Sequence, residues 1–454
     1  MAIQLNQEIS PQSLVPKIRR LWKLSGPKIH RLQSRWETTK GTPVFTERGV
    51  YATRGWTEWT QGFQFGSALL HYEATGQEKF LLIGLQGTRD HMATHVSHTG
   101  VHDHGFNNIS TYGNLWRMAC EGTLPLELTN REAWELALKV SGAVQAARWT
   151  STAEGGGYIY SFNGPHSLFI DTLRSLRSLA LAHQLGHVLM SECDRRVSLL
   201  HRLVMHLEAT VRYNVFFGTG RDTYDVRGRV AHEAIFNTND GRFRCPNSQQ
   251  GYSSLTTWTR GLAWGLCGLV EQWEFLISQP AHLFPERLSR AEVLETVREA
   301  AVATAEFYIS ETPTCGLPYW DTGAPGLVRL GDYLNRAADP FNEHEPVDSS
   351  AAAIAAQGLL RLGRLLGKSR GKTFWQAGLK VADTLFSDPY LSSDEDHEGL
   401  LLHSVYHRPN GWDYTAPGQK VPNNESSMWG DYHLRELALL IQREAQGQPW
   451  LRFF

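Results

Sequence analysis

Two aspartates, Asp103 and Asp171, each stand immediately before an apolar run with helical spacing, where a helix is expected to begin. In a helical barrel both carboxyl groups would point into the same opening, where the positive ends of the helix dipoles also favour a bound anion. Aspartate is also a favoured N-cap, so helix capping is the competing explanation for both positions. Asp348 and Asp431 fit the capping explanation better, since Asp348 precedes two serines and a run of alanines.

A cluster of histidines overlaps the first of these aspartates, and its members are His91, His95, His98, His102 and His104. Histidines four residues apart on one helical face can bind zinc, but Gly100 interrupts the spacing and no H-E-x-x-H motif is present. We therefore expect neither a metal nor another cofactor. The histidines that flank Asp103 are expected to set its hydrogen bonds or to contact a substrate, and a metal-dependent hydrolase stays open as an alternative.

Arg260 lies two residues after Trp258, at the head of another apolar helical run. Its planar guanidinium suits a carboxylate ligand, and a structural ion pair explains the residue equally well. The chain has 15 tryptophans, several of them at such heads rather than within the helical runs. Aromatic residues in these places suit a cleft that stacks on sugar rings or other flat ligands, although most of the tryptophans are also explained by filling the core.

The elements that position these residues are predicted to be helices in two sets. Six heads precede small-residue-rich helices that are expected to form an inner ring: Glu58–Thr60, His102–His104, Asp171–Thr172, Trp258–Arg260, Asp348–Ser350 and Trp429–Asp431. Six amphipathic segments between them are expected to form an outer ring: Ser13–Trp36, Glu78–His95, Asn130–Trp149, Cys193–Phe216, Ser289–Ile309 and Arg370–Phe386. The alternation predicts an all-α barrel with a single mouth.

The longest interruption of this pattern is Gly218–Tyr252. Within it, Val230–Phe236 is typical of a strand and Asn237–Gly241 of a hairpin turn, which predicts a small β-hairpin over the mouth. No linker divides the chain. We expect residues 1–40 to form an N-terminal arm or the first outer helix, and residues 41–454 to form the barrel domain.

Composition excludes several classes of protein. A net charge of -2 and a pI near 6.8 argue against a nucleic-acid partner, which requires a clustered basic face. The sequence has neither a signal-peptide pattern nor eighteen consecutive apolar residues, so no membrane segment is expected. Its 5 cysteines are widely spaced, which indicates reduced thiols rather than a disulfide framework. These features predict a soluble cytoplasmic protein.

Three segments together resemble the unsaturated glucuronyl hydrolases of glycoside hydrolase family 88. Gln250–Tyr252 followed by Trp258–Trp264 is similar to the family's HQGY…WARGQAW stretch, and Pro346–Ala355 and Trp429–Tyr432 resemble two further signatures. Gln249 and Leu262 depart from the first pattern. The resemblance implies an (α/α)6 barrel, in agreement with the helices expected above.

The resemblance also implies roles for individual residues. His102-Asp103-x-Gly105-Phe106 is similar to the family's H-D-x-G-F motif, which makes Asp103 the supporting carboxylate, and Phe169–Leu173 resembles the segment that holds the general acid/base, here Asp171. The residues that the resemblance places around the substrate are Trp59, His102, His232, Gln250, Trp258, Arg260 and Trp264.

The implied substrate is a lyase-generated oligosaccharide that ends in a 4,5-unsaturated uronic acid. The implied reaction is hydration of the C4=C5 double bond, with a neutral Asp171 protonating C4. This requires a raised pKa, which burial and a neighbouring ionised Asp103 are expected to supply. An inverting glycosidase on saturated chains, with Asp103 as base and Asp171 as acid, is the alternative. His403–Asp413 lacks the serine- and lysine-containing segment of members that act on sulfated substrates, so the sulfation preference stays open.

Overall fold

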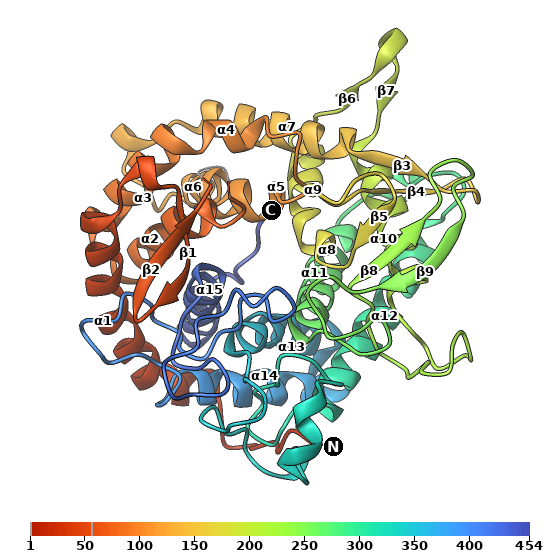
Figure 1. Cartoon of the computed structure of the whole chain (residues 1–454). Helices are drawn as coiled ribbons and strands as arrows, with labels where there is room; N and C mark the ends of the chain where they lie inside the picture. The colour runs from red at the N-terminus through yellow and green to blue at the C-terminus, as the bar shows by residue number, and fades with distance from the viewer. Residues whose placement is uncertain (1, 56–57) are drawn as a thin grey trace.

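The structure is a computed structural model that describes residues 2–55 and 58–454. Helices form two concentric rings around a central axis, as Figure 1 shows in a view along that axis. The inner ring consists of α2 (Gln61–Thr75), α5 (His104–Asn108) with α6 (Asn114–Cys120), α8 (Thr172–Ser175) with α9 (Arg177–Gln184), α11 (Thr259–Ile277), α13 (Ser349–Arg370) and α15 (Met428–Ala445). The outer ring consists of α1 (Pro11–Arg35), α3 (Glu78–His91) with α4 (Ala93–Val96), α7 (Arg131–Ala147), α10 (Leu199–Asn214), α12 (Arg290–Ser310) and α14 (Lys372–Leu385). The predicted (α/α)6 barrel is thus confirmed.

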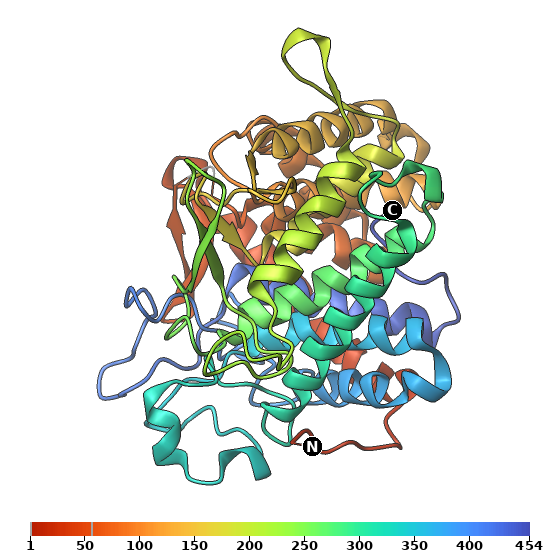
Figure 2. The ribbon, with the colours of Figure 1, turned by 90° about the vertical axis from the view of Figure 1, so that its right-hand side faces the viewer.

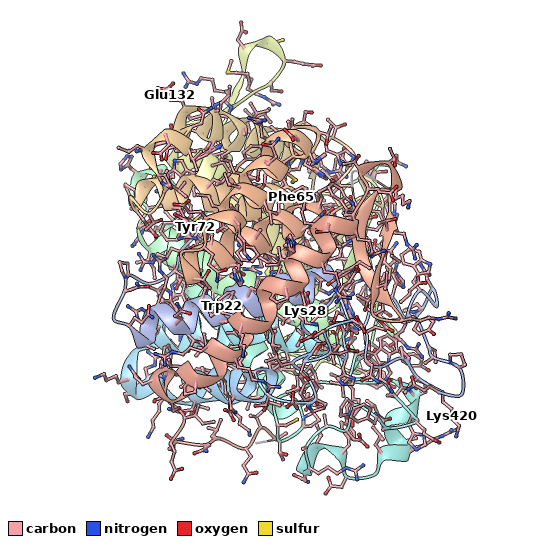
Figure 3. The ribbon with its side chains drawn as sticks, turned by 90° about the vertical axis from the view of Figure 1, so that its left-hand side faces the viewer. Trp22, Lys28, Phe65, Tyr72, Glu132 and Lys420 are labelled. Atoms are coloured by element: carbon pink, nitrogen blue, oxygen red, sulfur yellow. The ribbon has the colours of Figure 1, made fainter. Side chains whose placement is uncertain are left out.

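Capping residues mark the starts of several outer helices. Ser10 and Ser13 form a reciprocal capping box at the start of α1, with Pro11 in the first turn, where its missing N–H costs nothing. Ser289 and Glu292 form the same arrangement at the start of α12. Figure 3 shows α1 crossing the outside of the barrel next to α2. Short 3-10 helices occupy loops at Thr38–Lys40, Leu126–Leu128, Glu192–Asp194, Ala281–Leu283, Pro325–Leu330 and Tyr333–Asn335.

Two inner helices are interrupted, which the apolar spacing did not predict. A π-helical turn, Ile109–Gly113, separates α5 from α6. Side chains compete there with the backbone ladder, since Thr111 Oγ1 donates to the Asn107 carbonyl at 2.8 Å and Asn114 Nδ2 donates to the Ser110 carbonyl at 2.9 Å. The segment after Asp171 is likewise divided into α8 and α9.

In the residues that the structure describes, short strands lie beside the helices in four small sheets. They are β1 (Thr42–Glu47) with β2 (Val50–Arg54), β3 (Trp149–Ser151) with β4 (Gly157–Ile159), β6 (Leu189–Met190) with β7 (Arg196–Val197), and β5 (Ser167–Phe169) with β8 (Glu233–Phe236) and β9 (Phe243–Asn247). The predicted hairpin is confirmed as the antiparallel pair β8–β9, which also pairs with β5. Figure 2 shows β6–β7 projecting from the body of the barrel. None of the helices that the structure describes combines the length and hydrophobicity that a bilayer crossing requires.

The inner ring is crowded, and small residues permit the close approach of its helices. Every residue of Ala351–Ala356 in α13 is fully buried. A Cβ added to Gly358 of α13 would lie 3.0 Å from the backbone nitrogen of Cys267 in α11. A Cβ added to Gly268 of α11 would lie 2.6 Å from the backbone nitrogen of Arg174 in α8. Such contacts require glycine, as the small-residue pattern of the inner helices predicts.

A buried network of charges fills the ring below the mouth. Arg174 Nε donates to Glu271 at 3.0 Å and its Nη2 donates to Glu436 at 2.7 Å, while Arg361 Nη1 donates to Glu274 at 2.7 Å. All five side chains are almost fully buried. Burial alone would raise the pKa of Glu271, but the charges of Arg174, Arg177 and Arg361 and the hydrogen bond from Arg174 together keep that pKa below its usual range. The network therefore holds α8, α11, α13 and α15 together only while both signs of charge are present.

Arg174→Ala is predicted to lower the free energy of unfolding by about 3–5 kcal/mol, because it removes the arginine that donates to both Glu271 and Glu436 and leaves them the more distant charge of Arg177, at 3.7 and 3.9 Å. Arg131→Ala is the matched control, since Arg131 forms an exposed pair with Glu135 within one helix and its loss should cost less than about 0.5 kcal/mol. Urea unfolding followed by circular dichroism measures both changes. Equal stability of the two variants would contradict a role for the network in holding the ring.

Candidate active site

A cavity of about 510 Å³ opens where the inner helices begin. Its volume falls within the range of small-molecule sites, about 300–1,000 Å³. The predicted site residues that line it come from the heads of α2, α5, α8 and α11 and from the segment after β9. They are Trp59, His102, Asp103, Asp171, Gln250, Trp258, Arg260 and Trp264.

His102 lies between the two predicted acids. Its Nε2 is 3.1 Å from Asp171 Oδ1 and 3.9 Å from Asp103 Oδ1. All three residues are buried, with exposed fractions of 1% for His102, 7% for Asp171 and 8% for Asp103. A single imidazole nitrogen thus faces two carboxylates in a region of little solvent.

A buried hydroxyl fixes this arrangement. Ser175 Oγ accepts the Gly105 N–H at 2.9 Å and donates to the His102 carbonyl at 2.5 Å, which ties the head of α5 to α8. Gln145 Nε2, from outer helix α7, donates to the same carbonyl at 2.8 Å. A Cβ on Gly105 would lie 2.1 Å from the Ser175 carbonyl oxygen, so this contact explains the glycine of the H-D-x-G-F motif.

The capping explanation does not hold for the two acids. Asp103 and Asp171 occupy N-cap positions, but neither side chain makes a capping hydrogen bond. Asp348 does cap α13, since it accepts the N–H groups of Ser350 and Ala351. Capping is wrong for Asp431, which lies within the first turn of α15 and accepts the backbone N–H groups of Leu400 and Leu401.

The pKa values of the site contradict one expectation. Burial would raise the pKa of Asp171, but the hydrogen bond and the charge of His102 outweigh it and hold that pKa below its usual value. Burial raises the pKa of Asp103, and the charge of Asp171 adds to the rise although His102 opposes it. Burial would lower the pKa of His102, but the charge of Asp103 and the hydrogen bond to Asp171 raise it.

The prediction that Asp171 has a raised pKa is therefore wrong for the free protein. Burial does act to raise this pKa, but the hydrogen bond from His102, which the motifs do not predict, lowers it. That bond stabilises the ionised carboxylate and the cationic imidazole together. The directions of both pKa shifts therefore favour an ionised Asp171 beside a protonated His102 in the free protein.

Aromatic rings form the wall around the acids. Trp59 stacks on Trp429 with ring centroids 5.0 Å apart, and Trp264 packs against Phe106 with centroids 4.9 Å apart. Trp258 packs edge-on against His232 at 4.8 Å. Flat rings of this kind can contact the faces of a sugar and exclude water from the acids.

His232 lies behind this wall and is not part of the cavity lining. Its Nδ1 accepts the backbone N–H groups of Gln249 at 3.0 Å and Gln250 at 3.3 Å, so the proton of the neutral ring is on Nε2. Burial lowers the pKa of His232 to about 4, which keeps the ring neutral near pH 7. Nε2 has no partner within the described chain. In the free protein, His232 holds the segment that carries Gln250.

Arg260 forms the structural ion pair that the sequence left open. Its Nη1 donates to Asp348 at 2.9 Å and to the Val405 carbonyl at 2.6 Å, and its Nη2 donates to Gln250 at 3.1 Å and to the Tyr406 carbonyl at 2.8 Å. The side chain thus joins α11, α13 and two loops at the mouth. Its role as a direct ligand of a substrate carboxylate stays a prediction, because these four contacts already use both terminal nitrogens.

The histidines of the cluster do not converge on one point. Asn107 Nδ2 donates to His95 Nδ1 at 3.0 Å, and His104 is 3.0 Å from Ser141 Oγ through Nδ1 and 2.9 Å from the His98 carbonyl through Nε2. Burial lowers the pKa of both His95 and His104 to about 4. In the part of the chain that the structure describes, no group of three or more His, Cys, Asp or Glu side chains is placed to hold a metal ion.

Several lining residues were not predicted as site residues: Arg54, Glu58, Phe162, Tyr406, His407 and Trp412. Most come from loops and from the end of β2, which carry no helical periodicity. The exposed fractions of 51% for Phe162 and 46% for Trp412 mark them as unusual surface aromatics. Lys420, at the edge of the molecule in Figure 3, is paired with Glu343 at 2.5 Å and does not line the cavity.

Comparisons with known proteins show what this (α/α)6 barrel is similar to in sequence and in structure. No protein-family model matches the chain. It is 26% identical over 403 residues to an unsaturated glucuronyl hydrolase of Bacillus sp. (strain GL1), covering 86% of this chain and 88% of that protein. It is 24% identical over 419 residues to an unsaturated chondroitin disaccharide hydrolase of Streptococcus pyogenes serotype M1, covering 89% and 86%.

Among solved structures, the crystal structure of an unsaturated glucuronyl hydrolase specific for heparin superimposes with a TM-score of 0.72 and 19% identity, covering 95% of this chain and 98% of that one. The structure of the Bacillus sp. GL1 enzyme gives a TM-score of 0.69 at 22% identity, covering 93% and 97%. The similarity to unsaturated glucuronyl hydrolases that the motifs indicate is thus confirmed over most of the chain.

Arg260→Lys is predicted to lower the free energy of unfolding by about 1–3 kcal/mol, because a lysine ammonium cannot reach all four acceptors and leaves buried groups unpaired. Arg364→Lys is the control, since Arg364 forms a largely exposed pair with Glu444. Urea unfolding of both variants measures the change. An Arg260→Lys protein of wild-type stability would contradict the structural role and favour direct substrate contact.

Proposed function

We propose that this protein is an unsaturated uronyl hydrolase, a glycoside hydrolase that releases the terminal 4,5-unsaturated uronic acid of lyase-generated oligosaccharides by hydrating the C4=C5 bond. The observation that carries the proposal is the position of His102 between Asp103 and Asp171 in an aromatic cavity. This arrangement stores one proton beside a carboxylate that can deliver it and later take it back. The named relatives act on substrates of this class.

The first step is the protonation of C4. In the free protein, the raised pKa of His102 and the lowered pKa of Asp171 favour the proton on His102, whose Nε2 is hydrogen-bonded to Asp171. A bound substrate brings its own carboxylate and displaces water, and both effects favour a neutral Asp171 over an ionised one. The proton then moves along the hydrogen bond to Asp171, which transfers it to C4 as the π electrons of the double bond form the new C4–H bond.

The second step is the addition of water. Protonation leaves a positive charge at C5, which the ring oxygen shares and the buried carboxylates stabilise. Water forms the C5–O bond while Asp171 accepts its proton, which restores the shared proton of the pair. The resulting hemiketal opens to a ketone, C1 becomes a hemiacetal, and the next sugar leaves. No nucleophile attacks the anomeric carbon, so the carboxylate spacing that distinguishes ordinary glycosidases does not apply.

We further propose that the enzyme acts in a reducing compartment such as the cytoplasm. All five cysteines are free thiols, and Cys120, Cys193 and Cys245 are exposed. Exposed unpaired thiols are typical of proteins that are kept reduced.

Asp171→Asn is predicted to lower kcat by about 10²–10⁴-fold, because an amide can neither deliver nor accept the proton. The loss of the enoate ultraviolet absorbance of an unsaturated disaccharide measures the rate. Asp90→Asn, in an exposed helix position, is the matched control and should retain wild-type activity. An active Asp171→Asn variant would remove the proposed proton donor.

The same assay in heavy water distinguishes hydration from direct hydrolysis. Hydration places deuterium at C4 of the product, because protonation of that carbon is the first step. Cleavage without deuterium at C4, or cleavage of the corresponding saturated disaccharide, would favour the inverting glycosidase instead.

A further inference from the structure

Trp412 differs from the other tryptophans of the cavity by its exposure. Trp258 and Trp264 are 3% and 2% exposed and lie in the depth of the site near the acids. Trp412 lines the same cavity but is 46% exposed. A tryptophan that is both solvent-exposed and part of a cavity wall lies at its rim, where the part of a ligand outside the deep pocket passes.

The segment that carries Trp412 is held in place. Asp413 accepts the Tyr406 N–H at 2.5 Å and the His407 N–H at 3.1 Å, and the Trp412 N–H donates to the His407 carbonyl at 3.2 Å. Arg260 fixes the base of the segment through the Tyr406 carbonyl. The Trp412 ring rests on Tyr406, with centroids 5.3 Å apart, and on His407, with centroids 4.7 Å apart. The exposed ring is therefore preorganised, which lowers the entropic cost of binding a ligand.

The charges of the cavity do not favour a strongly anionic group at this rim. Arg54 and Arg260 are the arginines among the lining residues. The charge of Arg260 is neutralised by Asp348, and Glu58, which also lines the cavity, lies close enough to Arg54 to offset its charge. Burial lowers the pKa of His407 to about 4, so its ring beside Trp412 is neutral near pH 7. A sulfate at the rim would have to leave water without a cluster of cations to receive it.

We infer that Trp412 is the specificity-determining platform on which the leaving sugar, the residue linked to the unsaturated uronate, stacks through an uncharged ring face. This inference rests on the proposed function, which places the unsaturated uronate in the deep part of the cavity beside Asp171. The leaving sugar then extends outward to the rim. Stacking on a preorganised indole selects uncharged pyranoses over sulfated ones at this position.

The test compares two substrates that share the unsaturated uronate, an unsulfated disaccharide and the methyl glycoside, which has no leaving sugar. Trp412→Ala is expected to raise KM for the disaccharide roughly tenfold, as the loss of one aromatic contact predicts, with kcat little changed. On the methyl glycoside the variant and the wild type should have the same KM. Trp412→Phe should recover part of the disaccharide affinity, and Tyr224→Ala, an exposed aromatic outside the cavity, should behave as wild type.

Two results would overturn the inference while the proposed function stands: an unchanged KM of Trp412→Ala for the disaccharide, or an equal loss on the methyl glycoside. A wild-type enzyme that prefers the 6-sulfated disaccharide over the unsulfated one would contradict the uncharged character of the subsite. Failure of the proposed function gives a different result, since the wild type would then consume neither unsaturated substrate.

Discussion

The hydrogen bond between His102 and Asp171 is the interaction on which the chemistry proposed for this protein depends. It brings together the heads of two separate inner helices, and Ser175 and Gly105 set the distance between them. Without the imidazole, Asp103 and Asp171 would be two buried acids that repel each other's charge. With it, one proton is stored in a site with little water, beside the carboxylate proposed to transfer it.

The surrounding fold pairs several other buried carboxylates with buried arginines. Below the mouth, Arg174 links Glu271 to Glu436 and neutralises charges in the crowded ring. At the mouth, Arg260 neutralises Asp348 and holds two loops by their carbonyl groups. Buried ion pairs of this kind contribute little net stability, but the loss of one partner is costly, so they fix the geometry of the helices they join. Asp103 and Asp171 are thus held by helices and loops whose own buried charges are already paired.

Much of the architecture follows from local patterns. The 3.6-residue spacing predicts both rings, Ser289 with Glu292 predicts the start of α12, and the turn residues after Phe236 predict the β8–β9 hairpin. The interruption of the helix after Asp103 was not predicted, because it results from hydrogen bonds between side chains and the backbone and not from the spacing of apolar residues.

The site was predictable only in part. Eight of the nine residues chosen from motifs line the cavity, and His232 lies just behind it. Trp412 was not predicted as a site residue, because loop residues come together through tertiary contacts that leave no periodic signal in the sequence. The predicted direction of the Asp171 pKa shift was wrong, because the shift depends on a 3.1 Å contact with His102 that motif spacing cannot reveal.

The ionisation of His102, measured by nitrogen-15 NMR titration of the ligand-free protein, tests this account most directly. The spectrum of a His102→Gln variant assigns the signal among the 19 histidines. The account predicts a pKa above 6.5, so His102 is mostly cationic at pH 6.5 and loses its proton only as the pH rises further. The pKa should fall in the Asp171→Asn variant, which lacks the charged partner. A neutral His102 at pH 6.5, or a pKa that Asp171→Asn leaves unchanged, would contradict the stored proton.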